Sequence, residues 1–314
     1  IPYLSIPAAG VHGVGLRTLP KNIIKLARGV LASRKVLREF KPDVLFFTGG
    51  YVAAPMAIAG WRTPSLVTVP DIEPGLALKF LAWFADKITV SAPASTRYFP
   101  ARAARVVETG YPVRAGLLQW KRAAAREKLG LDAEKPVLLV LGGSKGARSI
   151  NNAILDNLPA LLERTQIVHI SGKLDWEKVN AAQMSLARKQ AQNYRAFDYL
   201  HEEMGAALAS ADLVVSRAGA SSLGEFPLFG LPAILVPYPY AWRYQKVNAE
   251  YLQEKGAALM VRDEELKEKL LPLVDGLLNN SQKLKEMRTA IQECARPQAT
   301  EKIAARLLAL AEKR

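Results

Sequence analysis

The stretch PVLLVLGGSKGAR at residues 136–148 decides the fold class of this chain. Mostly apolar residues come first, and two glycines follow them directly. Apolar residues then recur at helical spacing, at Ile150, Ile154, Leu158 and Leu161. A continuous apolar strand, a glycine turn and an amphipathic helix in this order predict one unit of a parallel α/β sheet whose two faces are both covered.

The same order of strand, Gly- or Pro-marked turn and helix recurs along the chain. The expected strands cover residues 43–47, 65–69, 87–90 and 106–109, and then 136–141, 166–170, 194–197, 212–216, 233–237 and 258–261. Helical patterns close the chain at residues 263–291 and 298–313. Two such series in tandem predict an α/β protein of two doubly wound, Rossmann-like domains that face each other across a cleft.

Composition sets the expected domain boundaries. Residues 113–135 are charged and carry no strand pattern, so we expect them to link an N-terminal domain (1–112) to a C-terminal domain (136–297). We expect residues 298–314 to form a helix that packs back toward the N-terminal domain. The first residue is Ile1 and no signal-peptide pattern follows it, so we expect the N-terminal domain to be incomplete at its start.

The chain has 314 residues and a formal net charge of +14, and positive charge is concentrated near its start. Residues 1–38 contain no Asp or Glu, but they contain Arg17, Lys21, Lys25, Arg28, Arg34, Lys35 and Arg38. Excess positive charge can serve nucleic acid, an anionic membrane surface or phosphorylated substrates. Zinc-ligand spacing, RNA-binding aromatic motifs and helix-turn-helix signals are all missing from the sequence, so we expect no nucleic-acid partner.

The segment Leu19 to Phe40 has apolar residues at helical spacing, namely Ile23, Ile24, Ala27, Val30 and Leu31. We expect a basic amphipathic helix whose apolar residues enter the lipid interface while Lys21, Lys25 and Arg28 meet anionic headgroups. The alternative is a helix packed on the N-terminal sheet, with its basic face merely solvated. The sequence has no uncharged apolar run of 18 residues, so we expect no segment that spans a bilayer.

The loop GGSKGA at residues 142–147 is the first candidate for ligand binding. Glycines let the backbone approach a ligand closely, and the start of the following helix offers amides to an anion. The hydroxyl of Ser144 can add a further hydrogen bond to a phosphate. The alternative is a plain strand-to-helix turn, and the spacing is not that of a Walker P-loop.

A second candidate loop covers residues 216–225 and again joins a strand to a helix. Its backbone amides near Ala220 to Ser222 are expected to point at the cleft. The carboxylate of Glu225 can accept hydrogen bonds from both hydroxyls of a ribose. The alternative, a solvated helix charge, is disfavoured by the segments GLP (230–232) and VP (236–237) that follow.

Other candidate residues are polar and uncharged. Gln245 and Asn248 open a helix after a strand, where amide side chains suit the recognition of sugar hydroxyls. His169, at the end of a strand, is interpreted as structural, and His201 is expected to act through its backbone. We find no Asp-x-Asp pair, so we expect no metal on a bound diphosphate and no cofactor.

Taken together, five motifs resemble the MurG family of GT-B glycosyltransferases. They are GGYV (49–52), YPVR (111–114), GGSKGA (142–147), HISGK (169–173) and RAGASSLGE (217–225) with Gln245 and Asn248. The resemblance implies inverting transfer of N-acetylglucosamine (GlcNAc) from UDP-GlcNAc to lipid I, the undecaprenyl-pyrophosphoryl-MurNAc-pentapeptide, giving lipid II for peptidoglycan. It also implies a cytoplasmic protein held peripherally on the inner face of the cell membrane.

By matching positions, the resemblance assigns donor-binding roles in this sequence. Arg114 and the backbone of His201 are expected to meet the uracil, and Ser144 the diphosphate. The diphosphate and ribose are expected to contact Ala220, Ser221, Ser222, Leu223, Gly224 and Glu225. Gln245 is expected to meet the sugar.

Three departures from the family pattern limit these assignments. The family's loop Gly-Gly-Thr-Gly-Gly-His, which carries the proposed catalytic base, is absent, so the base is unassigned. Asp71 replaces an asparagine expected near the acetamido group, and Tyr244 stands where His or Gln is usual. Two rival hypotheses stay open: another GT-B enzyme, such as a glycolipid synthase or a UDP-GlcNAc epimerase, or a non-catalytic donor-binding half that needs a partner.

Overall fold

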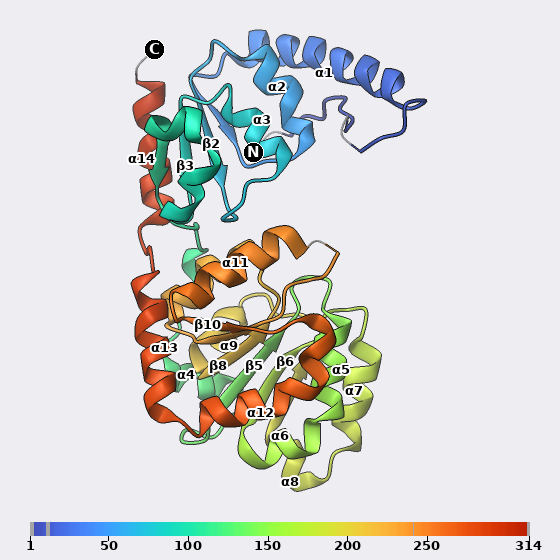
Figure 1. The fold of residues 1–314 in the computed structure, drawn as a ribbon, viewed down its shortest axis with the longest axis vertical. Coiled ribbons are helices and arrows are strands. Elements are labelled where there is room, and N and C mark those ends of the chain that lie inside the picture. The colour runs from blue at the N-terminus through green and yellow to red at the C-terminus, as the bar shows by residue number, and fades with distance from the viewer. Residues whose placement is uncertain (1–2, 11–12, 241, 313–314) are drawn as a thin grey trace. The chain divides into compact units, whose positions relative to one another are not determined.

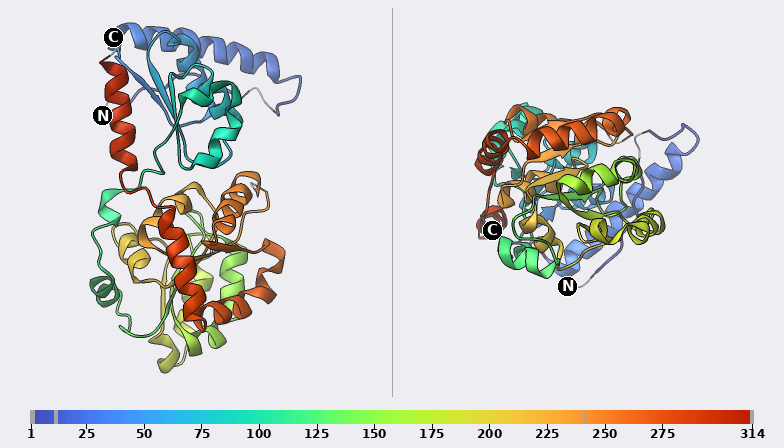
Figure 2. Two further views of the ribbon diagram at one scale, coloured as in Figure 1. Left: turned by 60° about the vertical axis from the view of Figure 1, so that its left-hand side comes forward. Right: turned by 90° about the horizontal axis from the view of Figure 1, so that it is seen from below.

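The computed structural model describes residues 3–10, 13–240 and 242–312. It divides into two compact units, each built around one sheet (Figures 1 and 2). The N-terminal unit comprises residues 1–110 together with 298–314, and the C-terminal unit comprises residues 111–297. The expected final helix therefore belongs to the N-terminal unit, and the expected linker, residues 113–135, belongs to the C-terminal unit.

The sheet of the N-terminal unit is parallel and has the order β1-β2-β3-β4. Its strands are β1 (Leu45–Phe47), β2 (Ser65–Val69), β3 (Lys87–Val90) and β4 (Val106–Glu108). All five residues of β2 are buried, as is typical of a parallel strand whose two faces are both covered.

Helices cover both faces of that sheet. They are α1 (Leu19–Phe40), α2 (Ala54–Ala59), α3 (Leu76–Ala82) and α14 (Ala299–Ala311), with 3₁₀ turns η1 (Tyr51–Ala53), η2 (Pro93–Tyr98) and η3 (Pro100–Arg105). Neighbouring residues of β2 point to opposite faces. Val67 packs in the cluster that includes residues of α2 and α3, whereas Leu66 packs against Ile303 and Leu310 of α14. Figure 1 shows α14 on one side of this sheet and α2 and α3 on the other.

Helix α1 has the bounds that the sequence predicted. It contacts α2 and is closely packed at Gly29, where an added Cβ would lie 2.1 Å from the Pro7 carbonyl oxygen and 3.0 Å from Pro55 Cγ. Much of the helix faces outward, because Ile24 is 56% exposed and Leu31 is 63% exposed. Among the helices that the structure describes, none combines the length and the apolar character that spanning a bilayer requires.

The sheet of the C-terminal unit is parallel too, with the order β10-β9-β8-β5-β6-β7. Its strands are β5 (Val137–Leu141), β6 (Gln166–Ile170), β7 (Tyr194–Phe197), β8 (Leu213–Ser216), β9 (Ala233–Leu235) and β10 (Ala258–Met260). The chain winds outward from β5 to β7, returns to β8 on the other side of β5, and continues to β10. The switch point of this doubly wound sheet therefore lies between β5 and β8, where ligands bind at the carboxyl ends of the strands.

The helices of this unit are α4 (Arg122–Lys128), α5 (Arg148–Asp156), α6 (Leu158–Arg164), α7 (Trp176–Ser185), α8 (Arg188–Ala191), α9 (Met204–Ser210), α10 (Glu225–Phe229), α11 (Trp242–Glu254), α12 (Leu266–Leu278) and α13 (Ser281–Glu293). Its 3₁₀ turns are η4 (Ala115–Leu117), η5 (Ala220–Leu223) and η6 (Asp263–Glu265). Leu138 and Val140 of β5 share one core cluster with residues of α5, α6 and α12, including Ile154 and Leu270. Buried Leu139 points to the other face of the sheet.

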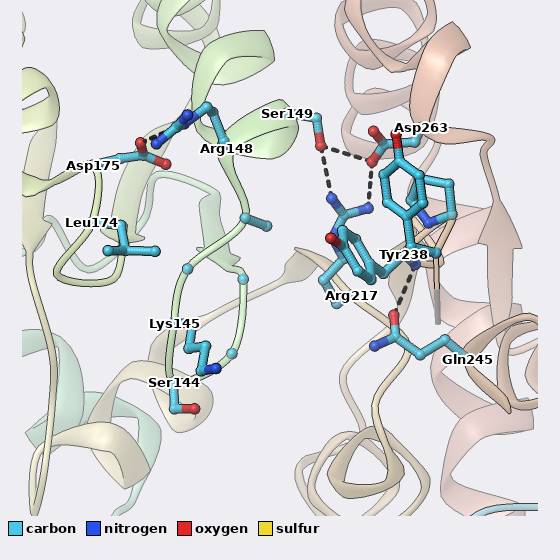
Figure 3. Close-up of a pocket in the computed structure, with 16 residues that line it drawn as sticks. Ser144, Lys145, Arg148, Ser149, Leu174, Asp175, Arg217, Tyr238, Gln245 and Asp263 are labelled. Atoms are coloured by element: carbon cyan, nitrogen blue, oxygen red, sulfur yellow. Dashed lines mark hydrogen bonds and ion pairs between the residues drawn. The ribbon is translucent and has the colours of Figure 1, made fainter. Parts of the chain in front are cut away.

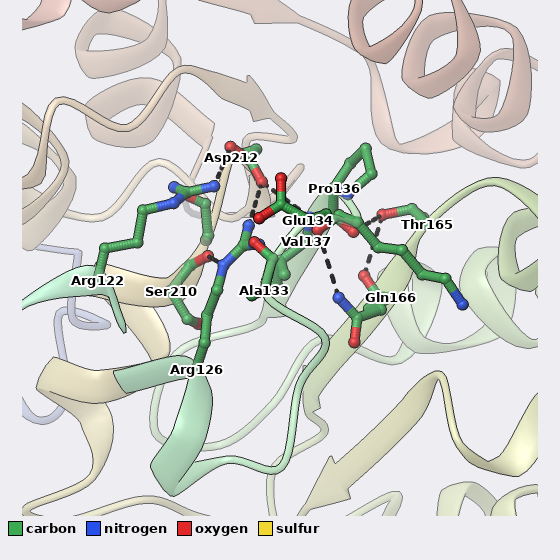
Figure 4. A network of polar contacts seen from close by, with 12 residues as sticks. Arg122, Arg126, Ala133, Glu134, Pro136, Val137, Thr165, Gln166, Ser210 and Asp212 are labelled. Carbon is green, nitrogen blue, oxygen red and sulfur yellow. Dashed lines mark hydrogen bonds and ion pairs between the residues drawn. The ribbon is translucent and has the colours of Figure 1, made fainter. Parts of the chain in front are cut away.

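Residues 113–135 are held to the C-terminal unit by a buried polar network (Figure 4). The Arg126 guanidinium, 4% exposed, donates to Asp212 Oδ2 at 2.8 Å and to the Ser210 carbonyl at 3.2 Å. Asp212 also accepts from Arg122 at 2.6 Å and from the Val137 amide at 2.9 Å. Burial is the largest cause that lowers the pKa of Arg126, and the Asp212 charge opposes it.

The predicted strands and the two-domain α/β class are confirmed, with strand ends shifted by at most two residues. The predicted helical stretch 263–291 is interrupted. A 3₁₀ turn begins it, and α12 ends at Leu278. Asn280 then caps α13, because its side chain accepts from the Lys283 amide at 2.9 Å.

Candidate functional site

The loop of residues 142–147, here called the glycine loop, joins β5 to α5 in a conformation that needs its glycines. Gly143 and Gly146 have φ of +80° and +82°. An added Cβ at Gly142 would lie 2.2 Å from the Ala147 nitrogen, and one at Gly146 would lie 2.1 Å from the Ser171 carbonyl oxygen. The loop closes on itself through a 2.9 Å hydrogen bond from the Gly146 amide to the Gly143 carbonyl.

A cavity of about 810 Å³ opens at this loop (Figure 3). Its walls come from the carboxyl-end loops of β5, β6, β8 and β9 and from the segment after β10. Besides the loop itself, the lining includes Arg148, Leu174, Asp175, Arg217, Tyr238, Gln245 and Asp263. The cavity therefore lies at the switch point of the sheet, and its volume is of the size that holds a small organic ligand.

Arg217 ties together several walls of the cavity. Its side chain is 10% exposed and donates through Nη1 to the Asp263 carboxylate and through Nη2 to Ser149 Oγ at 2.8 Å. Nη1 also reaches the Val236 carbonyl at 3.0 Å. The guanidinium carbon lies 5.3 Å from the centroid of the Tyr238 ring. Arg217 was recognised from the sequence only as the first residue of the motif RAGASSLGE (217–225), and no role was predicted for it.

Glu225 is half-buried at the start of α10. Burial raises the pKa of its carboxyl, and two smaller effects oppose the rise, the Arg114 charge and a hydrogen bond with Ser221. The structure therefore brings three predicted donor-binding residues close together. Arg114 itself is exposed.

The segment Ala220–Leu223 forms the turn η5. The amide and hydroxyl of Ser222 both donate to the Gly219 carbonyl, at 3.0 and 2.6 Å, so the polar groups of this buried residue stabilise the turn. Gly224 is in close contact with the YPVR motif, because an added Cβ would lie 2.7 Å from Tyr111 Cδ1. That close packing brings the motif that carries Arg114 to the loop that carries Glu225.

The remaining predicted residues are dispersed. Ser144 and Gln245 line the cavity, whereas Arg114, His201 and Glu225 do not. Gln245 accepts from the Tyr238 amide at 2.9 Å, and the exposed His201 ring lies 4.6 Å from that of Tyr199. Asp71 follows β2 in the N-terminal unit.

Two motif residues serve the interior. Asn248 is fully buried and donates to the Ala218 carbonyl at 3.1 Å. His169 is fully buried with both ring nitrogens in hydrogen bonds, which confirms its structural interpretation. Among the residues described, no group of three or more His, Cys, Asp or Glu is placed to hold a metal ion.

Two models of one family match the chain. The glycosyltransferase family 28 C-terminal domain matches residues 137–303, and the N-terminal domain of the same family matches residues 1–90. The chain belongs to glycosyltransferase family 28. This family 28 chain is thus a glycosyltransferase, as the sequence predicted.

Curated relatives of the chain carry a more specific enzyme name than the family models do. The chain is 37% identical to a protein of Roseiflexus sp. (strain RS-1), over 97% of the chain and 77% of the relative. It is 38% identical to one of Desulforamulus reducens, over 95% and 82%. Both are named UDP-N-acetylglucosamine–N-acetylmuramyl-(pentapeptide) pyrophosphoryl-undecaprenol N-acetylglucosamine transferase.

Solved structures agree with these relatives. MurG of Acinetobacter baumannii superposes with a TM-score of 0.72 at 25% identity, covering 91% of the chain and 79% of that structure. The resemblance to the MurG family and the GT-B fold class are therefore confirmed. The UDP-GlcNAc 2-epimerase of Neisseria meningitidis superposes with a TM-score of 0.65, covering 92% of the chain and 81% of that structure, but at 13% identity it shares the fold alone.

Proposed function

We propose that the C-terminal unit binds UDP-GlcNAc and that this family 28 glycosyltransferase moves GlcNAc to lipid I, giving lipid II. The reaction is the one stated in the names of its curated relatives. The observation that carries the proposal is the glycine loop at the start of α5, which borders a cavity whose lining also includes Gln245.

The diphosphate of the donor binds at the glycine loop. Amides at the start of α5 and the Ser144 hydroxyl donate to its oxygens, and no acidic residue lies in the first turn of that helix. Lys145 and Arg148 line the same cavity and add positive charge. The leaving diphosphate gains negative charge as its bond to the sugar breaks, so donors fixed in advance stabilise the transition state.

The rest of the donor binds through the other predicted residues. Arg114 and the backbone of His201 meet the uracil, Ala220 to Glu225 the diphosphate and ribose, and Gln245 the sugar. Glu225 accepts from the two ribose hydroxyls in its ionised form.

The bonds that form and break in the transfer show that the reaction needs a general base. The acceptor hydroxyl oxygen bonds to the anomeric carbon from the side opposite the diphosphate, and UDP leaves with the electron pair of the broken bond. The proton of that hydroxyl passes to a general base. We assign none of the described residues to that role.

Helix α1 holds the protein on the inner face of the cell membrane, beside its lipid-linked acceptor. Ile23, Ile24 and Leu31 are more than half exposed, and Lys21, Lys25 and Arg28 are exposed on the same helix. Each basic residue near an anionic surface contributes about 1 kcal/mol, so a few such residues give loose, reversible attachment.

An assay with UDP-GlcNAc labelled in the sugar tests the proposed reaction. We expect labelled GlcNAc to appear in lipid-linked product only when a lipid I analogue is added. Ser144→Ala should reduce the rate of this transfer. Conversion of UDP-GlcNAc to an epimer without acceptor would contradict the proposal and favour an epimerase. UDP binding without any transfer would favour the non-catalytic alternative.

A further inference from the structure

A chain of buried polar side chains runs from the core of the C-terminal unit to the cavity. His169 Nδ1 lies 2.7 Å from Tyr194 Oη, and His169 Nε2 lies 2.9 Å from Asn151 Oδ1. Asn151 Nδ2 lies 2.9 Å from both the Ser171 carbonyl oxygen and Asp175 Oδ2. Asp175 Oδ1 in turn accepts from Arg148 Nε at 3.1 Å (Figure 3).

The acceptors at Ser171 and Asp175 determine which atom donates in each hydrogen bond of this chain. A carbonyl oxygen and a carboxylate can only accept, so Asn151 must turn its NH₂ group toward Ser171 and Asp175. Its Oδ1 then faces His169, which must carry its proton on Nε2 and accept from the Tyr194 hydroxyl at Nδ1. Burial lowers the pKa of His169 to about 3, so the ring stays neutral and keeps this tautomer.

The first branch of the chain ends under the glycine loop. Asn151 holds the Ser171 carbonyl, and this is the atom that an added Cβ at Gly146 would approach to 2.1 Å. The next residue, Gly172, has φ of +77°, and a Cβ there would lie 2.4 Å from the Gly146 nitrogen. The glycine loop therefore packs directly against the backbone at residues 171–172, and Asn151 fixes the position of that backbone.

The second branch ends in the cavity wall. Asp175 is 11% exposed in its side chain, whereas Arg148 is 74% exposed. The bond to Asp175 uses Arg148 Nε, so the two terminal guanidinium nitrogens can serve an anion in the same cavity. Asn151 holds the carboxylate that orients this arginine.

We propose that Asn151, oriented by His169, is a positioning residue for the donor diphosphate, fixing both the glycine loop and Arg148 in their binding arrangement. This inference rests on the proposed binding of the diphosphate at the glycine loop. Neither residue touches the donor. Both act through the backbone at residues 171–172 and through Asp175, in the way that hydrogen-bond partners behind a ligand-binding group fix its orientation.

The test compares binding of UDP and uridine by calorimetry. Uridine lacks the diphosphate and so does not use the glycine loop. We expect Asn151→Leu to weaken UDP binding roughly tenfold or more, the usual effect of losing a buried hydrogen-bonded group, and to leave uridine binding unchanged. His169→Phe should have the same effect, and His169→Gln should restore UDP binding, because a Gln amide can donate to Asn151 and accept from Tyr194.

A matched control lies at the amino ends of β5 and β6. Thr165, just before β6, is buried and donates to the Pro136 carbonyl at 2.8 Å, at the end of β5 opposite the glycine loop. Thr165→Val should lose stability without changing the ratio of UDP to uridine affinity. Equal weakening of UDP and uridine binding by Asn151→Leu would overturn the positioning role, as would unchanged UDP binding by that folded variant.

Hydrogen exchange without ligand separates this inference from the proposed function. We expect the Gly146 amide to exchange faster in Asn151→Leu and His169→Phe than in the wild type, His169→Gln or Thr165→Val. If the wild type binds UDP and uridine equally, the proposed diphosphate site is wrong, and the exchange result alone decides whether Asn151 fixes the loop. Unchanged exchange of Gly146 in both defective variants would contradict the inference.

Discussion

Arg217 Nη2 donates to Ser149 Oγ at 2.8 Å, and this bond joins the loop after β8 to the first turn of α5. Ser149 Oγ itself donates to Asp263 Oδ1 at 2.7 Å, and the same carboxylate binds Arg217. Three segments that meet only in the folded C-terminal unit are thus fixed around one guanidinium. Its position in the lining makes the shape of the cavity depend on this cluster.

Replacing Arg217 with Lys should weaken UDP binding. Lysine keeps the charge, but its single ammonium cannot span Ser149, Asp263 and the Val236 carbonyl as the planar guanidinium does. We expect a loss of about 1–3 kcal/mol, the usual cost of broken buried hydrogen bonds. Calorimetric titration with UDP measures it, with the exposed Arg188→Lys as the control. UDP affinity equal to that of the control would show that the cluster does not shape the site.

Replacing Asp212 with Asn should destabilise the protein strongly. Asp212 is the carboxylate that pairs with Arg126, whose charge is buried at 4% exposure. Breaking a buried ion pair on one side leaves the other charge uncompensated, at a cost of about 3–5 kcal/mol. The half-exposed Arg122 also binds Asp212, and Arg122→Ala should cost only about 0–1 kcal/mol. Urea unfolding of both variants measures the difference, and equal midpoints would rule out this account of how residues 113–135 are held.

His169 should make the fold sensitive to acid. Its pKa is lowered to about 3 in the folded state, below the ordinary value of 6.5, so the unfolded chain binds a proton that the folded chain does not. Stability due to this group is therefore present above pH 6.5 and is lost as the pH falls toward 3. Between pH 6.5 and 5 the loss is about 2 kcal/mol, at about 1.4 kcal/mol per pH unit.

The variant His169→Gln removes this titration and keeps the hydrogen bonds. Melting temperatures measured from pH 7 down to pH 4.5 should fall less steeply for the variant than for the wild type. Parallel curves for the two proteins would mean that His169 titrates normally in the folded state and is not sealed in the core.

Reversing the charge of Lys21, Lys25 and Arg28 to Glu should abolish binding of the protein to anionic vesicles. The attraction of these three exposed residues to the surface would become repulsion. Sedimentation with vesicles that contain an anionic lipid measures the effect, and UDP affinity should not change. A control variant with Lys267, Lys283 and Lys285 changed to Glu has the same net charge and should still sediment. Equal vesicle binding by the two variants would rule out a role for α1.

The sequence predicted the strands and the two glycine-bearing loops because parallel strands buried on both faces leave long apolar runs, as in β5. It predicted the bounds of α1 from helical spacing. It did not predict the partners of Arg217, because Asp263 is 46 residues away and only the sheet order brings the two together. Nor did it predict that Asn151, one helical turn into α5, points inward to His169. Its neighbours supply the apolar pattern, and nothing local marks a polar residue as a core partner.

Binding of a UDP-sugar by the C-terminal unit, with Glu225 on the ribose, is tested most directly by one titration. UDP is titrated into the wild type, Glu225→Ala and the exposed control Glu177→Ala, with EDTA present throughout. We predict metal-independent binding by the wild type and the control, and binding weaker by about 1–3 kcal/mol for Glu225→Ala, the cost of losing charge-assisted hydrogen bonds. Because burial raises the pKa of this carboxyl, wild-type affinity should also fall as the pH is lowered through that pKa. Equal affinity of Glu225→Ala and the wild type for UDP would contradict the account.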